Sequence, residues 1–287
     1  MDLEHRDPLQ AMSRNRAVRG VYLMVRRYLR HGVSTQSAAL AFYLLFTLFP
    51  LMIFFSALLG LLRLNVASIL SDLSRLLPVE VVDFIRVYLD YVGQNPSVRL
   101  LLFGLFFSLY FPMRATNTLM RAVRTAYHLG PPKAPVLQML KTLIYTVLLI
   151  VTITAVLVLL TVGEWLLTYA VEHFGLPVEF AALWQRLRFP AMALLMYFAL
   201  YLLYAMTQDT RQPLRNIYPG VLFAMVGWMV VSMCYSFYVE NIASYSLFYG
   251  SIGTAIVLLM WLYLTAAVLI MGGEFNGMLI SLRREKG

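Results

Sequence analysis

The chain has 287 residues, of which 61% are hydrophobic and 13% charged, with a formal net charge of +9 and a mean hydropathy of +0.74. Hydrophobicity at this level excludes an ordinary water-soluble domain and indicates a protein that crosses a membrane several times. Cys234 is the single cysteine, which excludes an intrachain disulfide and a cysteine metal cluster. Residues 1–31 have no small-residue cleavage site after a short apolar core, so we expect no cleaved signal peptide.

A basic amphipathic helix is predicted at residues 14–31. Its apolar face consists of Val18, Val21, Val25 and Tyr28. The other positions carry five arginines, Arg16, Arg19, Arg26, Arg27 and Arg30. This pattern is typical of a helix that lies on a membrane surface and binds anionic lipid head groups. Topology determinants without a binding role explain the arginines equally well.

Six apolar runs follow, and we predict that each forms a transmembrane helix. A helix rises about 1.5 Å per residue and needs roughly 20 apolar residues to cross the hydrocarbon core. The predicted spans are 37–62, 98–120, 138–163, 189–207, 217–239 and 251–273. Because backbone polar groups in lipid must be paired within helices, the expected fold is all-α, a polytopic six-transmembrane-helix bundle.

The predicted domain organisation has three parts. Residues 1–35 form a cytoplasmic basic interfacial segment, 36–280 form the transmembrane domain, and 281–287 form a cytoplasmic tail. Between the first two spans, residues 64–97 are too polar to cross a membrane but are regularly amphipathic. We expect two helices there that lie on the outer interface or cap the mouth of the bundle.

Proline residues interrupt the first two spans. Pro50 lies near the centre of the first span, removes a backbone donor and should kink the helix. The carbonyl that it leaves unpaired serves packing or a ligand. In the second span, Pro112 should bend the helix just before the first charged residue.

The second span is short and is followed by arginines. Its uncharged run, Leu100–Met113, has only 14 residues, which cover about 21 Å as a helix. Arg114, Arg121 and Arg124 follow at spacings of seven and three, which align them along one helical stripe. The stripe either faces an anionic substrate or lipid head group inside the protein, or snorkels to the cytoplasmic head groups.

The fifth span contains small residues that favour close helix packing. It opens at Pro219 and Gly220, and Gly220, Ala224 and Gly227 keep one face small.

The sixth span follows Gly250 and Gly253, carries Trp261 and Tyr263, and ends at Glu274. Glu274 either pairs with an arginine of the stripe or is an exposed interfacial carboxylate. With Arg114, Arg121 and Arg124 it forms the hypothetical substrate-binding set. We assign structural or gating roles to Pro50, Pro112, Pro219, Gly220, Gly250, Gly253, Trp261 and Tyr263.

The charge distribution predicts the orientation in the membrane. The N-terminus, the 114–141 segment, the 208–216 loop and the C-terminus hold 17 Lys and Arg residues, against six on the other side. The positive-inside rule therefore places both termini in the cytoplasm. Since basic loops are the ordinary outcome of this rule, the net charge does not indicate nucleic-acid binding.

Three stretches of the chain carry a resemblance to a known family. They are Ala38–Tyr43 continuing to Thr47–Leu51, then Arg121–Tyr127, and finally Tyr218–Gly220 with Ser244-Tyr245, Tyr249–Ser251, Trp261–Tyr263 and Gly273–Asn276. In this order the stretches resemble the YihY/BrkB family of bacterial inner-membrane proteins, over residues 14–285. Arg124 stands where that pattern has Asn, so a role for this position does not carry over.

The resemblance implies a six-span α-helical bundle of the bacterial cytoplasmic (inner) membrane. It identifies architecture better than activity. The family has been labelled both a transfer-RNA-processing ribonuclease and a serum-resistance factor, and a role in moving lipids or other envelope components has been proposed for some members.

The residues themselves give no support for an enzyme. His5, His31, His128 and His173 are scattered, and no phosphate loop, nucleophile motif or zinc-type histidine pair is present. We therefore expect no enzyme activity, cofactor or metal.

The leading hypothesis is a protein that transports or flips a lipid or amphipathic envelope component, with Arg114 and Arg121 holding the head group. A proton-coupled version needs Glu274 or Glu240 to titrate. The alternative is a non-transporting membrane scaffold for envelope integrity or serum resistance, and a small-ion or solute channel is third. Expected partners are membrane phospholipids, the substrate and, as an open option, further copies of the chain, but no nucleic acid.

Overall fold

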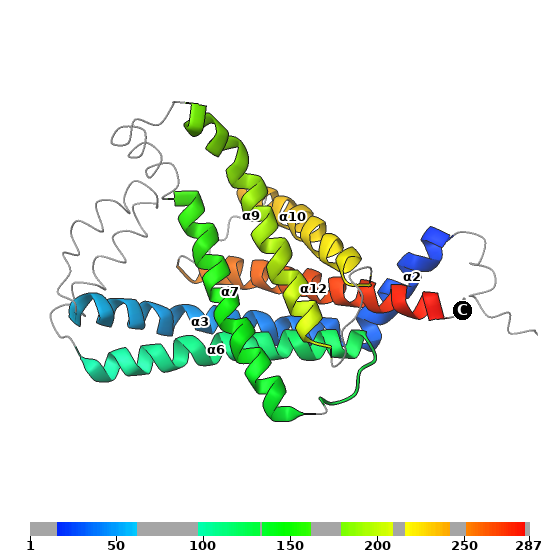
Figure 1. The fold of residues 1–287 in the computed structure, drawn as a ribbon, viewed down its shortest axis with the longest axis horizontal. Helices are drawn as coiled ribbons and strands as arrows, with labels where there is room; N and C mark the ends of the chain where they lie inside the picture. The colour runs from blue at the N-terminus through cyan, green and yellow to red at the C-terminus, as the bar shows by residue number, and fades with distance from the viewer. Residues whose placement is uncertain are drawn as a thin grey trace, which may run out of the picture. The chain divides into compact units, whose positions relative to one another are not determined.

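The computed structural model describes residues 16–61, 97–132, 134–161, 179–208, 216–241 and 251–284. The regular structure in these ranges is helical, which confirms the predicted all-α class. The amphipathic segment predicted at 64–97 lies outside the described residues, as does Gly250. Figure 1 labels the helices α2, α3, α6, α7, α9, α10 and α12.

The helices run α2 (Arg16–Arg30), α3 (Val33–Leu61), α6 (Val98–Ala126), α7 (Pro135–Thr161), α9 (Glu179–Met206), α10 (Tyr218–Asn241) and α12 (Ser251–Arg284). Five of them, α3, α6, α7, α10 and α12, are long and apolar enough to cross a membrane. The apolar part of α9, Pro190–Met206, is shorter. A polytopic membrane protein is therefore confirmed, while a sixth span at α9 stays a prediction.

Two helices extend well beyond their predicted bounds. α12 continues from the expected end at 273 to Arg284, because the stretch Gly272–Met278 is packed inside the protein rather than placed at a membrane surface. α9 begins at Glu179 rather than at 189 and continues through Pro190. The predicted spans end at charged or small residues, whereas the helices continue past these residues.

The turn between α2 and α3 depends on a glycine. Gly32 has a φ of 60°, the left-handed conformation that glycine adopts without a steric penalty. The amide of His31 donates to the carbonyl of Arg27 at 2.9 Å, and Gln36 donates from its side chain to the carbonyl of His31 at 2.7 Å. These bonds place His31 in the turn, next to the last residues of α2.

The described helices contribute to two compact units. The first takes Met1–Ala41, Thr116–Tyr145 and Tyr197–Gly287, and the second takes Phe42–Ala115 and Thr146–Met196. In the first unit, α10 and α12 lie side by side and α2 packs against α12 (Figure 1). Two buried tyrosines join further helices, since Tyr204 donates to the carbonyl of Leu269 at 2.7 Å and Tyr145 to that of Ala199 at 3.1 Å.

The close crossing of α10 and α12 confirms the small face predicted for the fifth span. A Cβ added at Gly220 would collide with the carbonyl oxygen of Gly272 and the side chain of Asn276. Ala224 is fully buried on the same face. Pro219 lies in the first turn of α10, where its missing N–H costs no helical hydrogen bond. Small residues let two apolar helices approach closely where lipid provides no hydrophobic drive.

The second unit contains residues 42–61 of α3 and 98–115 of α6, the parts of these helices that hold the prolines. Pro50 and Pro112 are buried inside α3 and α6, which continue on either side of them. Aromatic rings fill the space between the two helices, with the Phe46 and Phe111 centroids 5.9 Å apart and those of Phe107 and Phe111 5.8 Å apart. Ring packing around the prolines is consistent with the packing role predicted for Pro50.

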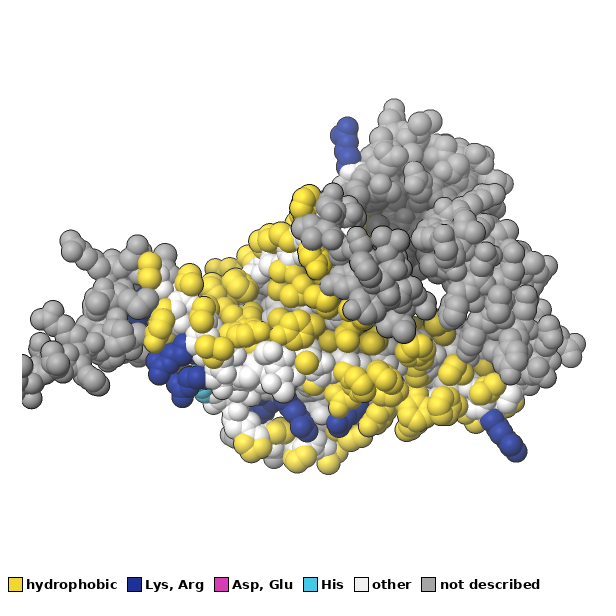
Figure 2. Space-filling view, turned by 180° about the vertical axis from the view of Figure 1, so that it is seen from behind, with side chains coloured by type: hydrophobic (Ala, Val, Ile, Leu, Met, Phe, Trp, Pro, Cys, Tyr) yellow, Lys and Arg dark blue, Asp and Glu magenta, His cyan; other side chains and the backbone are white. Residues whose placement is uncertain are grey.

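The outer surface of the described helices is strongly apolar, as Figure 2 shows for one face. On α10, hydrophobic residues at helical spacing are more than half exposed, namely Val226, Met229, Val230, Met233 and Phe237. A water-soluble protein rarely exposes such a continuous stripe, whereas a helix in contact with lipid requires one.

The crossing at Gly220 can be tested by one added methyl group. Gly220→Ala overpacks the contact with Gly272 and should cost about 1–3 kcal/mol of stability, read as a lower thermal unfolding temperature in detergent. Gly20→Ala is the matched control, because nothing lies within 4 Å of a Cβ there. The control should gain about 0.8–1 kcal/mol from helix propensity. Unfolding of Gly220→Ala at or above the wild-type temperature would contradict the crossing.

Candidate functional site

The N-terminal helix α2 is basic, amphipathic and only partly covered. It contains no acidic residue, and its last turn holds Arg27 and Arg30. Val18, Val21, Val25 and Leu29 lie along one side and are 47–71% exposed. An exposed apolar stripe bordered by arginines is typical of a helix that rests at the membrane interface. The described contacts therefore agree with the predicted interfacial character.

A cavity of about 570 Å³ lies between α2, α10 and α12. Its wall on α2 includes Gly20, Met24 and Tyr28, and its remaining lining includes Phe275 and Met278 of α12. Phe275 stacks on Phe223 of α10, with ring centroids 4.9 Å apart and planes 10° apart. The lining is almost entirely apolar, and its methionines and aromatic rings suit a flexible hydrocarbon ligand.

The cavity opens to the outside along α2. Val21 and Val25 belong to its lining and are nevertheless 66% and 54% exposed. A ligand could therefore enter from the side of the protein where the apolar stripe of α2 lies.

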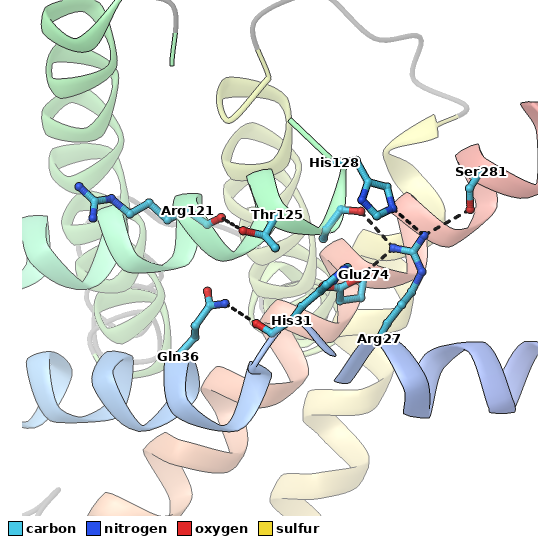
Figure 3. Close-up of polar contacts among 9 residues, drawn as sticks. Arg27, His31, Gln36, Arg121, Thr125, His128, Glu274 and Ser281 are labelled. Carbon is cyan, nitrogen blue, oxygen red and sulfur yellow. Dashed lines mark hydrogen bonds and ion pairs between the residues drawn. The ribbon is translucent and has the colours of Figure 1, made fainter. Parts of the chain in front are cut away.

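A buried ion pair fixes α2 to α12 beside this cavity (Figure 3). Glu274 of α12 has no exposed surface, and its Oε2 accepts from Nη1 of Arg27 at 3.0 Å. Its Oε1 lies 2.5 Å from Nδ1 of His31. Because an ionised carboxylate can only accept, the imidazole must carry its proton on Nδ1. We call Arg27, His31, Glu274 and the adjacent His128 the Glu274 cluster.

Arg27 also connects the cluster to the end of α6. Its Nη1 donates to the carbonyl of Ala126 at 3.1 Å, and its Nη2 donates to Oγ of Ser281 at 3.3 Å. Nη2 lies 3.4 Å from Nε2 of His128. Ala126 is the last residue of α6, so the guanidinium satisfies a carbonyl that has no partner within the helix.

His128 follows α6 in the left-handed conformation, with a φ of 55°. Burial, and then the positive charge of Arg27 and the neighbouring His31, hold the pKa of His128 below its usual range. The rings of His31 and His128 meet edge to face, 5.6 Å apart. Protonation of His128 therefore works against the charges that already surround it.

Tyr263 joins α12 to both N-terminal helices. Its hydroxyl lies 2.9 Å from Oγ of Ser34 and 3.4 Å from the hydroxyl of Tyr28. Since Tyr28 lines the cavity, the structural role predicted for Tyr263 corresponds to a specific contact. The Tyr263 hydroxyl provides a second polar contact that holds the cavity wall in place.

Trp261 also has a structural role, between α10 and α12. Its Nε1 donates to Oγ of Ser232 at 3.2 Å, and its ring meets that of Trp228 at 6.5 Å. Gly253, which was predicted as a gating residue, is buried in the first turns of α12.

Within the first unit, the predicted substrate-binding residues Arg121, Arg124 and Glu274 do not form one site. Arg124 is 5% exposed and donates to the carbonyls of Gly130 at 2.7 Å and of Thr207 at 2.9 Å. Arg121 is exposed, and Figure 3 shows its side chain directed away from Glu274. The continuous arginine stripe is thus a wrong prediction, because helical spacing did not reveal that Arg124 turns inward to backbone carbonyls.

Glu274 also differs from expectation, whereas Arg114 stays a candidate for head-group contact. Arg114 is exposed and donates to the hydroxyl of Tyr43 at 3.1 Å, with its guanidinium 5.4 Å from the centre of that ring. Glu274 is neither an exposed carboxylate nor bound to the stripe, so both predicted alternatives are wrong. Its partners come from α2 and the following turn, which lie far away in the sequence.

Sequence reasoning also missed Arg27, His31, His128 and Asn276. Asn276 accepts from the amide of Gly220 at 2.7 Å and donates to the carbonyl of Ile217 at 2.9 Å, so it caps the start of α10. One signal was present, because Arg27 and His31 are one helical turn apart and Glu274 is the only acid of α12. Within the described ranges, no group of three or more His, Cys, Asp and Glu side chains could hold a metal ion.

The apolar helices and the basic interfacial helix define a multi-pass α-helical membrane protein. Among known protein families, residues 24–286 match the family described as Virulence factor BrkB. The chain belongs to this family. The match covers nearly the whole chain and confirms the resemblance drawn from the sequence motifs.

Similarity to individual proteins agrees with this family membership. The chain is 30% identical to the ribonuclease-like protein YfkH of Bacillus subtilis over 253 residues, 88% of this chain and 92% of that protein. It is 29% identical over 75 residues to UPF0761 membrane protein PSHAa0171 of Pseudoalteromonas translucida, 26% of this chain and 25% of that protein. Another UPF0761 membrane protein, from Alteromonas mediterranea, is 30% identical over 87 residues, 30% of this chain and 29% of that protein. No solved structure matches the chain.

Substitution of two arginines of α6 tests whether Arg124 is a buried structural residue while Arg121 is not. Arg124→Ala leaves the carbonyls of Gly130 and Thr207 without this donor, and each lost hydrogen bond to a charged group should cost about 1.5–3 kcal/mol. Arg121→Ala, on the exposed side of the same helix, should change stability by less than about 0.5 kcal/mol. Thermal unfolding in detergent measures both. Equal losses in the two variants would show that Arg124 is not a buried structural residue.

Proposed function

We propose that this protein binds a lipid, or a similarly amphipathic component of the bacterial envelope, and moves it within the membrane. The observation that carries the proposal is the apolar cavity, open on one side, beneath a basic interfacial helix. An acyl chain in the cavity gains about 0.8 kcal/mol for each methylene group removed from water. A phosphate head group would remain outside, beside α2.

The charge of α2 favours an anionic head group. Arg26 and Arg30 are exposed on the helix that forms the cavity wall, and the helix has no acid to neutralise them. Guanidinium groups bind phosphate through two parallel hydrogen bonds. Arg114 and Arg121, both exposed, stay candidates for head-group contacts elsewhere on the protein, whereas Arg124 does not.

We also propose the bacterial cytoplasmic membrane as the location, with both termini on the cytoplasmic side. The basis is the excess of Lys and Arg at the two ends and in the 114–141 segment. In this orientation the arginines of α2 face the anionic cytoplasmic leaflet, which attracts basic segments by about 1 kcal/mol per residue.

Ribonuclease activity belongs to the name of one relative and is not part of our proposal for this chain. Both carboxylate oxygens of Glu274 are engaged by Arg27 and His31, which leaves this acid unsuited to bind a catalytic metal ion. Incubation of purified protein with RNA and Mg²⁺ tests this point directly. Cleavage that disappears in Glu274→Gln would require an enzymatic function instead.

The lipid proposal is tested by filling the cavity from Gly20, where an added Cβ meets no other atom within 4 Å. Gly20→Leu places four carbons in the lining and should reduce copurified lipid about tenfold, which corresponds to about 1.4 kcal/mol. Native mass spectrometry and lipidomics of protein extracted in nanodiscs measure the bound lipid.

Val18→Leu is the control, because Val18 lies on the same helix, is 47% exposed and is not part of the cavity lining. This variant should retain lipid as the wild type does. If the wild type retains only bulk-membrane lipid, or if Gly20→Leu has no effect, the cavity does not bind lipid. A non-transporting scaffold would then be the better description.

A further inference from the structure

The Glu274 cluster contains more ionisable groups than a purely structural ion pair requires. Three acids lie in the described residues, Glu179, Glu240 and Glu274. Of these, Glu274 is the one next to the cavity, since it precedes Phe275 and lies one turn before Met278, which both line it. It is completely buried, while the side chains of its partners Arg27 and His31 are 12% and 15% exposed.

The groups that face Glu274 are all bases. Arg27 of α2 and His31 of the following turn contact the carboxylate, and His128 at the end of α6 lies beside them. Arg30 of α2 acts at longer range on His128. Ser281 of α12 and the hydroxyl pair Tyr28–Tyr263 add neutral polar contacts. The single negative charge of Glu274 therefore balances a cluster whose other ionisable members are neutral or positive.

The cluster and the cavity share α2 and α12. Arg27 is adjacent in sequence to Tyr28 and one turn from Met24, which line the cavity on α2. Glu274 is adjacent to Phe275, which lines it on α12. Loss of the Arg27–Glu274 contact would therefore release the wall of the cavity itself.

We propose that the Glu274 cluster is a proton-binding site that controls the position of α2. With Glu274 ionised, α2 is held against α12 and forms the wall of the cavity. Proton uptake by the cluster releases α2 and widens the cavity. Only the biological use of this movement rests on the proposed lipid function. The movement of α2 itself can be measured without any substrate.

The direction of the pH dependence follows from the charges. A proton on Glu274 turns its carboxylate into a neutral acid and removes the counter-charge of Arg27. The pKa of His128 is lowered in the docked arrangement, mainly by burial and then by Arg27. Between that lowered pKa and the ordinary value of about 6.5, the docked form holds fewer protons than the released form, so acidification favours release.

His31 acts in the opposite direction. Its protonation would add a positive charge next to Glu274 while that carboxylate is still ionised, and so would strengthen docking. Release therefore depends on Glu274 and His128 rather than on His31. Histidine is suited to this task because its charge changes between about pH 5 and 8 when the surroundings shift its pKa.

The test measures the distance from α2 to α10 at different pH. Spin labels are attached through Val18→Cys and Leu222→Cys, which are 47% and 48% exposed, in a chain whose exposed Cys234 is replaced by Ser. The full-length protein is studied in nanodiscs of phosphatidylethanolamine and phosphatidylglycerol by double electron–electron resonance. We expect one short distance at about pH 8 and a second, longer population at about pH 5.

Three variants show which residues cause the pH-dependent change in distance. Glu274→Gln keeps the side-chain shape without the charge, and should show the longer population already at about pH 8. Arg27→Gln should do the same from the other side of the contact, and serves if Glu274→Gln fails to fold. His128→Asn keeps a residue that tolerates a positive φ, and should shift the midpoint of the transition to lower pH.

Two results would overturn the proposal. One is a wild-type distance that stays the same between about pH 8 and 5. The other is a folded Glu274→Gln that keeps the wild-type response. Lipid retention without a pH response would refute this inference alone, whereas a pH response without bound lipid would refute the proposed function alone.

Discussion

A buried carboxylate on α12 imposes the main constraint on the first unit of this protein. An ionised Glu274 without exposed surface is tolerated only if positive and hydrogen-bonding groups reach it, and removal of one partner from such a pair typically costs about 3–5 kcal/mol. Its partners, Arg27 and His31, come from the beginning of the chain. The N-terminal helix must therefore return to the far part of α12, and the cavity between them is a consequence of this return.

The helices around the cluster make α12 the element against which the others are placed. α10 crosses it closely at Gly220, and Asn276 of α12 satisfies the backbone at the start of α10. Tyr204 of α9 donates to the carbonyl of Leu269 in the backbone of α12. These contacts join α9 and α10 to α12 through its backbone and Asn276, whereas the α2 wall of the cavity is held mainly by side-chain contacts.

This contrast connects structure with function. A basic helix with an exposed apolar stripe belongs at the surface of an anionic membrane, and the same helix forms one wall of an apolar space. Membership in the BrkB family establishes an integral membrane protein and leaves its substrate open. Under the proposed function, the charge and the lining of the cavity favour amphipathic substrates, because the site offers hydrocarbon contact inside and arginines outside.

The sequence by itself determined the all-α membrane class, the family, the basic N-terminal helix and the small face of the fifth span. These features are local, since they depend on hydropathy, helical spacing and residue size. Only the tertiary structure decided that Arg124 turns inward to Gly130 and Thr207, and that Glu274 pairs with Arg27 and His31. Sequence spacing locates charges on one helix, but the partner of a buried charge is chosen by packing between segments, here nearly 250 positions apart.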